Sequence, residues 1–416
     1  MMAGRLTGWR GALVLPGWLA LAPVLWANTA TDAATAAAEA EAGKAVPVSA
    51  PAATPEKHGT WHVRTLDGVD YVPLEDLRGF YKLMSLQPRT RKVAGQRLLG
   101  NGELELLFGP APRELRIQDR LCVLSHPVQE DASGDLLIAR TDVLHVIEPV
   151  LRPTYIANRQ AVRTVVLDPG HGGHDTGTVT PYAREADVAL VVASRLGAEL
   201  RKRGYEVVFT QEQNQYLSPQ ARVDKANAAP AAIFLSLHLN SGRSDREGVQ
   251  TYTLAPVEKN EKPLPGHEFS ASSMALAMAL QSAMIEKAGA EDGGCRRAHY
   301  SPLSSLRCPA VMLELGFATH PEEGTRLSSE EYQLKVVNAL ADGIDAYARV
   351  MNPATVLQVQ KAPVVETPPE PVKVTPAPVR TQPKKTKAQP RKKAARRRAP
   401  ARKPANSNRL NNRRRR

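Results

Sequence analysis

The sequence predicts an α/β fold over residues 163–351, with a mainly parallel sheet covered by helices on both faces. Two observations support this prediction. Apolar, β-branched runs alternate along the chain with amphipathic segments of about 10–20 residues. The boundaries between them carry turn residues, such as Asp-Pro-Gly at 168–170 and a glycine at 204. A small, mostly β domain is predicted at residues 58–153, and a disordered Pro-rich and basic tail at residues 352–416.

Within the α/β segment the elements follow one another in regular order. We expect strands at 164–168, 206–210, 232–238, 248–254 and 309–315, and helices at 185–204, 217–229, 270–288 and 328–350. In the segment ahead of it, residues 61–74 are typical of a hairpin that turns at Asp67-Gly68, because this dipeptide supports positive φ angles. A short helix is expected at 74–83. Further strands are expected within 98–109, 113–118, 119–128 and 134–147.

The first 27 residues are typical of a secretory signal peptide. Arg5 and Arg10 precede an apolar stretch that ends at Ala27 and is too short to span a bilayer. An uncleaved membrane anchor is the alternative interpretation. Residues 28–57, rich in Ala, Thr, Glu and Pro, are predicted to be a disordered linker. We therefore expect an exported protein of the periplasm or cell envelope.

The net charge of +13 comes from the tail. Residues 380–416 hold 17 lysines and arginines and no acid, so the rest of the chain has 38 basic and 42 acidic residues, a net charge of −4. Basic tails usually indicate nucleic acid. For an exported protein we expect instead anionic wall polymers or a lipid surface as the partner of the tail, and no nucleic acid.

Three cysteines are present, at 122, 295 and 308. An odd number leaves at least one thiol unpaired in an exported protein. A bridge between Cys295 and Cys308 and buried free thiols are both compatible with the sequence. Because no CxxC spacing occurs, thiolates are not expected to bind a metal.

Four residues are predicted to meet at the carboxyl edge of the sheet. His171 follows the first strand on a glycine-rich turn, His238 and Glu314 close two later strands, and Glu185 opens the first long helix. Two imidazoles and one carboxylate form a three-ligand set for catalytic Zn²⁺, with a fourth position open for water. Glu314 is then available as a general base. The four residues together predict a zinc hydrolase.

Each residue also has a structural interpretation. A histidine at a strand end is often structural, and a glutamate in a first helical turn is favoured by the helix dipole in any case. His174 is an alternative ligand to His171, which we prefer because it lies directly behind the Asp-Pro-Gly turn. We interpret Asp175 as supporting a ligand or capping a turn, and Asp168 as a turn residue. The histidines at 62, 126 and 145 lack ligand spacing and are interpreted as structural.

The α/β segment resembles the zinc-dependent N-acetylmuramoyl-L-alanine amidases of the third amidase family, which cut bacterial peptidoglycan. The motifs occur in order: LDPGHGGHDTG, READVAL, LSPQARVDKAN, FLSLHLNS and DGGCRRAHYSPLSSLRCPAVMLELGF. The resemblance covers about residues 163–350. It implies that His171, Glu185 and His238 bind zinc, that Glu314 is the catalytic glutamate and that peptidoglycan is the substrate.

The sequence departs from the family pattern at a few positions. Ala186 stands where the family often has Lys, Gly293-Gly294 where it often has Arg-Gly, and residues 300–304 where it has Phe-x-Val-Leu-Arg. The last two departures concern substrate contacts rather than metal binding. Some cell-division members carry a long helical insert that occludes the zinc. The corresponding loop here, about residues 255–269, is short and broken by Pro263, Pro265 and Gly266, so we expect no such occlusion.

Residues 58–153 are similar to the copper-amine-oxidase N-terminal-like domain, a stalk module found ahead of bacterial wall hydrolases. The similarity rests on YVPLEDL and the spaced hairpins. Whether this domain binds wall or spaces the enzyme stays open, as does the need for a protein activator. An inactive wall-binding scaffold and a zinc peptidase acting within the stem peptide are the alternative functions.

Overall fold

The computed structural model describes residues 61–86, 96–109, 111–157, 159–229, 232–257 and 261–351. These residues all belong to one compact unit, Met1–Gln360. The predicted signal peptide, linker and basic tail lie outside the described residues. Among the described helices, none combines the length and the apolar composition that crossing a bilayer requires.

The structure confirms the predicted hairpin at the start of the described chain. Strand β1 (Arg64–Leu66) pairs antiparallel with β2 (Val69–Pro73). Asp67 and Gly68 form the turn with φ angles of 49° and 81°, as a hairpin turn with two positive φ values requires. The predicted short helix follows at once as α2 (Leu74–Phe80).

Antiparallel strands make up most of the N-terminal β region, which we define as residues 61–151. One sheet has the order β1-β2-β9-β8, and the other strands form a meander from β3 to β7. The bounds are β3 Met84–Leu86, β4 Arg97–Gly100, β5 Glu105–Phe108, β6 Glu114–Ile117, β7 Arg120–Val123, β8 Gln129–Glu130 and β9 Leu136–Ala139.

The strand predicted over 134–147 is wrong in its second half. Only β9 is extended, and the chain then forms α3 (Arg140–Asp142), the π-helical η1 (Val143–Ile147) and α4 (Glu148–Leu151), with the 3₁₀ turn η2 (Pro153–Tyr155) after them. The buried Asp142 carboxylate accepts the N–H groups of Ser125 and His126. These bonds hold the turn, and Val143, Val146 and Ile147 then bury one helical face.

The predicted mixed α/β fold is confirmed for the following segment. Its strands are β10 (Thr164–Pro169), β11 (Glu206–Phe209), β12 (Ala232–Asn240), β13 (Val249–Leu254), β14 (Asp292–Ala298) and β15 (Ala310–Phe317). Its helices are α5 (Glu185–Lys202), α6 (Pro219–Asn227), η3 (Pro265–Phe269), α7 (Ser270–Ala283), η4 (Met284–Ala288), α8 (Ser301–Ser305), α9 (Pro321–Ser328) and α10 (Glu330–Met351). Strand β14 and helix α8 were not anticipated from the sequence.

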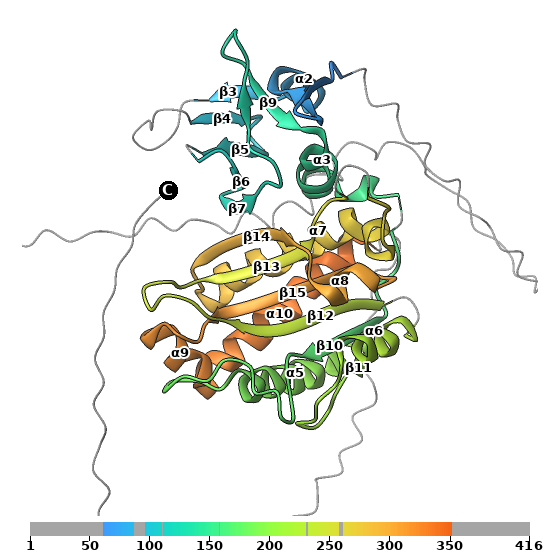
Figure 1. Cartoon of the computed structure of the whole chain (residues 1–416), viewed down its shortest axis with the longest axis vertical. Helices are drawn as coiled ribbons and strands as arrows, with labels where there is room; N and C mark the ends of the chain where they lie inside the picture. The colour runs from blue at the N-terminus through green and yellow to red at the C-terminus, as the bar shows by residue number, and fades with distance from the viewer. Residues whose placement is uncertain are drawn as a thin grey trace, which may run out of the picture. The chain divides into compact units, whose positions relative to one another are not determined.

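The strands of this segment lie in the order β11-β10-β12-β15-β13-β14 (Figure 1). All neighbours pair in parallel except β13 and β15, which are antiparallel. The reversal at β13 was not anticipated, because the direction of a strand depends on where the connecting segment returns and not on the strand's own pattern.

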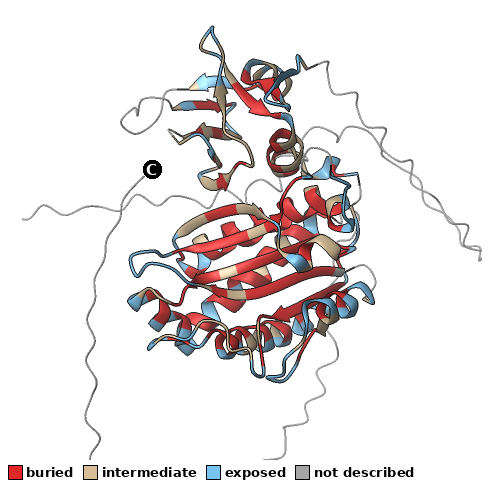
Figure 2. Cartoon of the chain, viewed as in Figure 1, coloured by how far each residue is buried: buried red, intermediate tan, exposed pale blue. Residues whose placement is uncertain are grey.

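Helices cover both faces of the sheet. Helices α5, α7 and α10 pack on one face, where Val165 and Leu235 join a large core, while α6 and α8 cover the other, where Val166 and Phe234 join a smaller one. Alternate residues of each strand therefore serve opposite cores. The central strands of the α/β segment are buried along nearly their whole length, whereas its loops and outer helix faces carry most of its exposed residues (Figure 2). This burial explains the uniformly apolar strands of the sequence.

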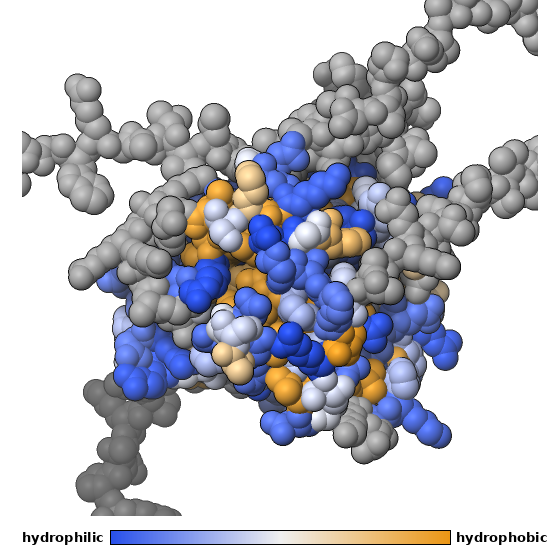
Figure 3. Space-filling view, turned by 90° about the horizontal axis from the view of Figure 1, so that it is seen from above, coloured by the Kyte–Doolittle hydropathy of each residue, from blue (hydrophilic) through white to orange (hydrophobic). Residues whose placement is uncertain are grey.

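The sheet does not end at β14. Strand β7 of the N-terminal β region pairs in parallel with β14 through Cys122 and Cys295. The meander β3 to β7 and the sheet of the α/β segment therefore form one eleven-stranded sheet. The N-terminal β region thereby covers an edge strand that would otherwise expose unpaired backbone groups. Viewed from above, the described surface is a mosaic in which hydrophilic side chains separate smaller apolar groups (Figure 3).

His145 generates a prediction about pH. Burial, together with the charges of Arg297 and His267, lowers the pKa of His145 to about 4. Its Nδ1 atom is buried and has no hydrogen-bond partner among the described residues. The unfolded chain therefore binds more protons than the folded chain between pH 6.5 and about 4, and the stability that His145 contributes is lost as the pH falls through this range.

We expect the free energy of unfolding to fall by about 2 kcal/mol more in the wild type than in His145→Gln between pH 8 and pH 5. Denaturant titrations at both pH values measure this difference. His299→Gln, which removes an exposed imidazole, is the control and should behave like the wild type. Equal losses in the wild type and His145→Gln would contradict the prediction.

Candidate metal centre

Parallel pairing brings three of the predicted site residues to one edge of the sheet. His171 lies two residues past the end of β10, and the structure pairs His238 of β12 directly with Glu314 of β15. Glu185 is the first residue of α5, as the sequence predicts. The carboxyl ends of neighbouring parallel strands meet at a common rim, which is where ligands bind in such sheets.

The side chains of His171, Glu185 and His238 form a compact cluster. The Oε1 atom of Glu185 lies 2.9 Å from Nε2 of His171 and 2.9 Å from Nδ1 of His238. The possible ligand atoms all lie within 4.8 Å of one another. Glu185 is buried, and the two imidazoles are partly exposed, so the cluster opens toward solvent on the histidine side. Two imidazole nitrogens and one carboxylate oxygen are a donor set that zinc favours.

The electrostatics of the cluster favour added positive charge. The hydrogen bond to Glu185, opposed by burial and assisted by Asp175, raises the pKa of His171 to about 9. Burial would raise the pKa of Glu185, but the two histidines and the N–H of Thr178 lower it well below its usual range. A carboxylate that stays ionised between two imidazoles can attract a cation.

Asp175 supports His171 from the opposite side of the ring. Its Oδ1 atom lies 2.9 Å from Nδ1 of His171 and also accepts the N–H of Gly177. A carboxylate on the second nitrogen of a metal-binding histidine fixes the orientation of the ring and raises its basicity. His174, the alternative ligand, is exposed and packs against the ring of Tyr216 at 4.3 Å instead.

The turn that carries His171 is shaped by its backbone. His171 has a φ of 61°, a left-handed conformation that is uncommon for a residue with a side chain. Gly177 has a φ of 60°, and a Cβ atom there would lie 2.6 Å from both Glu185 Oε2 and His171 Cδ2. A side chain at position 177 would therefore push two members of the cluster apart.

Two buried side chains hold this turn from below. Arg222 of α6 donates from Nη2 to the carbonyl of His171 at 2.6 Å and from Nη1 to the carbonyl of Pro169 at 2.7 Å. The Nε2 atom of Gln211 donates to the same two carbonyls, at 2.6 and 2.8 Å. No role for either residue was predicted from the sequence, although Arg222 lies within the motif LSPQARVDKAN.

Asp168 anchors Arg222, and our interpretation of Asp168 as a turn residue is wrong. It lies inside β10, is 1% exposed, and accepts hydrogen bonds from Arg222 at 2.7 Å, Thr210 at 2.6 Å and Ser236 at 2.7 Å. The Asp-Pro-Gly tripeptide correctly indicates a turn, but Asp168 itself still belongs to the strand. Asp168 still faces Ser236 of β12 in the parallel register.

Glu314 differs from Glu185 because little in its surroundings stabilises the ionised carboxylate. Its Oε2 atom is buried without a hydrogen-bond partner among the described residues. Burial, with the negative charge of Glu185 and against the two histidines, raises the pKa of Glu314 to about 7. A carboxyl group with this pKa can both accept and release a proton near neutral pH.

Polar and aromatic side chains continue from Glu314 along the sheet. Gln250 of β13 is paired with Glu314, and its Oε1 atom accepts hydrogen bonds from Asn240 at 2.8 Å and Tyr252 at 2.7 Å. The ring of Tyr300 lies edge-on to that of Tyr252 at 5.3 Å. Tyr300 lies in the segment that departs from the family pattern.

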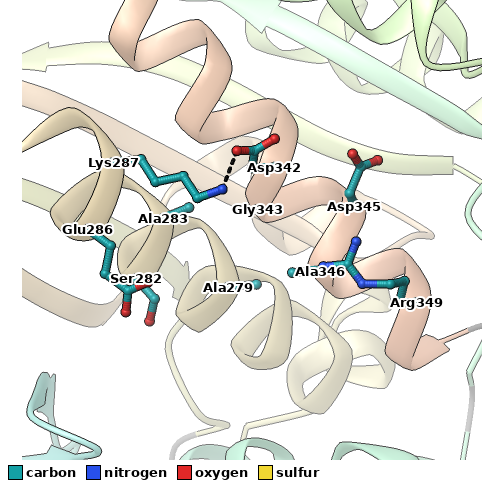
Figure 4. Close-up of a pocket in the computed structure, with 10 residues that line it drawn as sticks. All are labelled: Ala279, Ser282, Ala283, Glu286, Lys287, Asp342, Gly343, Asp345, Ala346 and Arg349. Atoms are coloured by element: carbon teal, nitrogen blue, oxygen red, sulfur yellow. Dashed lines mark hydrogen bonds and ion pairs between the residues drawn. The ribbon is translucent and has the colours of Figure 1, made fainter. Parts of the chain in front are cut away.

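The described part of the loop after β13 contains no long helix that could cover this edge. Of its described residues, 255–257 and 261–269, only Pro265–Phe269 are helical, as a single 3₁₀ turn. Elsewhere, a cavity of about 130 Å³ lies between α7 and α10. Figure 4 shows the side chains that line it, among them Lys287 and Asp342, which form an ion pair. None of the four predicted site residues lines that cavity.

Comparisons with known proteins concern the same segment of the chain. Residues 165–346, which include all four predicted site residues, match the family described as N-acetylmuramoyl-L-alanine amidase.

The chain is 32% identical over 185 residues to the uncharacterised protein YqiI of Bacillus subtilis (strain 168), and the aligned region covers 44% of this chain and 84% of YqiI. It is 29% identical over 187 residues to the amidase LytC of the same organism, covering 45% of this chain and 36% of LytC, or about a third of that relative's length. Among solved structures, the amidase AmiC2 of Nostoc punctiforme is 30% identical with a TM-score of 0.40, over 45% of this chain and 97% of that one.

The buried ion pair under the turn leads to a prediction. Arg222→Met would leave the Asp168 carboxylate buried without its cation and free two carbonyls of the His171 turn. We expect the free energy of unfolding to fall by about 3–5 kcal/mol and zinc affinity to weaken by about 10–100-fold. Chemical denaturation and competition with a zinc chelator measure the two effects.

Arg195→Met is the matched control, because Arg195 pairs with the largely exposed Glu330. The same substitution there should cost about 1 kcal/mol or less and leave zinc affinity unchanged. If Arg222→Met bound zinc as tightly as Arg195→Met, the turn would not depend on this clamp.

Proposed function

Because this chain belongs to the N-acetylmuramoyl-L-alanine amidase family, we propose that it is an exported zinc hydrolase of bacterial peptidoglycan. The bond it cleaves is the amide between N-acetylmuramic acid and L-alanine. The observation that carries the proposal is the cluster of His171, Glu185 and His238 beside a buried carboxyl oxygen of Glu314 that has no hydrogen-bond partner within the described part of the chain. The proposed metal ligands and the proposed acid–base group lie at one edge of the sheet, inside the segment that matches the family.

His171, Glu185 and His238 would hold the zinc ion. Their donor atoms converge on one region, Asp175 orients the first histidine, and the ionised Glu185 supplies negative charge. When bound, zinc supplies Lewis-acid activation of a water molecule and of the scissile carbonyl. Three protein ligands leave a coordination position for this chemistry, as in other catalytic zinc sites.

Glu314 moves the proton in this proposal. Water adds to the carbonyl carbon of the amide and gives a proton to the Glu314 carboxylate. Glu314 then delivers that proton to the amide nitrogen as the carbon–nitrogen bond breaks, which leaves the lactyl carboxylate on the sugar and a free L-alanine amine. The free oxygen of Glu314 and its raised pKa suit both transfers.

The residues beside Glu314 suit a substrate that joins a sugar to a peptide. Gln250 and Asn240 offer amide groups, and Tyr252 and Tyr300 offer ring faces of the kind on which sugars pack. The N-terminal β region would act as the stalk-like part of the enzyme, and the basic tail would bind anionic wall polymers or lipid surfaces. A zinc peptidase and an inactive scaffold remain as outcomes of the test below.

Product analysis tests the proposal. Full-length protein loaded with zinc is incubated with purified peptidoglycan and with small soluble muropeptides, and the products are identified by mass spectrometry. We expect free stem peptides that begin at L-alanine, together with peptide-free glycan. Cleavage inside the stem would reassign the enzyme as a peptidase, and no product from either substrate would favour a scaffold.

Two variants separate the proposed roles in the same assay. Glu314→Gln should bind zinc with wild-type stoichiometry while turnover falls by about 10²–10⁴-fold, because only the proton transfer is removed. His238→Ala should lose both zinc and turnover. Full activity in Glu314→Gln would show that this carboxylate does not carry the proton.

The basic tail generates a separate prediction. Removal of residues 380–416 should weaken binding to anionic wall or lipid material, with the largest difference at low salt, because exposed charges are screened as salt rises. Turnover of small muropeptides should stay close to the wild-type value. Co-sedimentation with wall fragments and with anionic vesicles over a salt series measures the first effect. A collapse of small-substrate turnover would place the tail in the catalytic unit.

A further inference from the structure

Two cysteines meet where the N-terminal β region joins the α/β sheet. Cys122 of β7 and Cys295 of β14 are direct partners in the parallel pairing of these strands. Both side chains are buried, at 0% and 1% exposure, and both belong to the same hydrophobic core. The sequence by itself is also compatible with a bridge between Cys295 and Cys308.

The structure separates Cys308 from this pair. Cys308 lies in the core on the other face of the sheet, beneath α6 and α8. Burial raises the pKa of the Cys308 thiol to about 12. The bridge between Cys295 and Cys308 is absent, and all three thiols are free in the structure.

The placement of Cys122 and Cys295 meets the geometric needs of a disulfide. Neighbouring strands lie about 4.7–4.9 Å apart, and disulfides usually join Cα atoms that are about 4.4–6.8 Å apart. Side chains of directly paired residues extend to the same face of a sheet, so the two sulfur atoms face one core. The Cys122 side chain is also a hydrogen-bonding neighbour that, with burial, raises the pKa of Cys295.

Surrounding contacts hold the two strands in this register. The N–H of Leu121 donates to Asp292 at 2.8 Å, and Arg120 forms an ion pair with Glu286 at 2.6 Å with both side chains only 15% exposed. Gly294 has a φ of 91°, and a Cβ atom there would lie 2.9 Å from the Leu121 side chain. The glycine before Cys295 therefore allows β7 to approach β14 closely.

We propose that Cys122 and Cys295 are oxidised to a disulfide that joins the N-terminal β region to strand β14. The two thiols together lose two protons and two electrons as the S–S bond forms. A dithiol oxidase in its disulfide form, or oxidised glutathione, accepts them and becomes two thiols. Because both cysteines are buried in the folded chain, the bond forms during folding, when β7 and β14 meet and before the surrounding core excludes the oxidant.

The disulfide rests on one part of the proposed function, which is export to an oxidising compartment. Its consequence is mechanical. The bond links the N-terminal β region to the strand that neighbours β13, which in turn pairs with the strand of Glu314. The N-terminal β region then cannot swing away from the catalytic segment while the enzyme works on the wall.

Thiol mapping of the full-length chain tests the proposal. The protein is refolded in a glutathione redox buffer, unfolded again without reductant and alkylated, and its peptides are mapped by mass spectrometry. We expect alkylation at Cys308 alone and a linked peptide pair that contains Cys122 and Cys295. Alkylation of all three cysteines in refolded protein with native circular dichroism would overturn the proposal.

Matched variants check the assignment. Cys308→Ala should keep the linked pair, whereas Cys122→Ala should leave Cys295 open to alkylation. Neither measurement requires zinc, export or turnover. A failure of the amidase proposal, seen in product analysis of the same preparation, is therefore distinguishable from a failure of the disulfide proposal.

Thermal unfolding tests the mechanical role. Reduction should lower the melting temperature of the wild type by roughly 5–15 °C. It should have no effect on the double variant Cys122→Ala/Cys295→Ala, which has no bond to lose. Equal shifts in the two proteins would show that the bond does not stabilise the junction.

Discussion

The buried ion pair between Asp168 and Arg222 is the interaction on which the candidate site depends. Asp168 lies near the end of a strand that is buried along its whole length, and Arg222 comes from α6, which covers one face of the sheet. An unpaired charge in this position would be strongly destabilising. Paired, the two groups direct the remaining donors of Arg222 to the carbonyls of Pro169 and His171. The left-handed backbone of His171 is therefore held in place by a buried side chain of the core.

The sheet also places two glutamates in contrasting surroundings a short distance apart. Glu185 lies between two imidazoles and a backbone N–H, so it stays ionised and suits a metal. Glu314 is paired with His238 in the register, but its free oxygen lies in a buried environment that raises its pKa to about 7. Pairs of titratable groups whose surroundings separate their pKa values often have different catalytic roles. Here one carboxylate would hold the metal and the other would move the proton.

The junction between the N-terminal β region and the α/β segment is more than a linker between two modules. Strand β7 extends the sheet past β14, and polar contacts from Leu121, Arg120 and Arg297 cross the junction. Pairing between β7 and β14 therefore links the N-terminal β region to the sheet that carries the candidate site. This pairing also covers part of the β14 edge, and a covered edge is less able to pair with another chain.

Local pattern by itself determined most elements of the fold and the identity of the clustered residues. Strand and helix periodicity located β10, α5, β12 and β15, and the rule that parallel strands end at a common rim brought His171, Glu185, His238 and Glu314 to one place. The elements depend on residues near each other in the chain, and the common rim follows from a general rule about parallel sheets, so both can be predicted from the sequence. The helical turn after Ala139 was missed because it depends on Asp142 capping a distant segment.

Only the tertiary structure decided the remaining features, because they depend on residues far apart in sequence. The antiparallel β13, the role of Asp168 under the turn, the clamp from Gln211 and Arg222, and the pairing of Cys122 with Cys295 all join positions separated by dozens of residues or more. Asp-Pro-Gly signals a turn whether or not its aspartate is buried, and a cysteine carries no sign of its partner. The sequence determined which chemistry is present, and the packing of the sheet decided which groups touch.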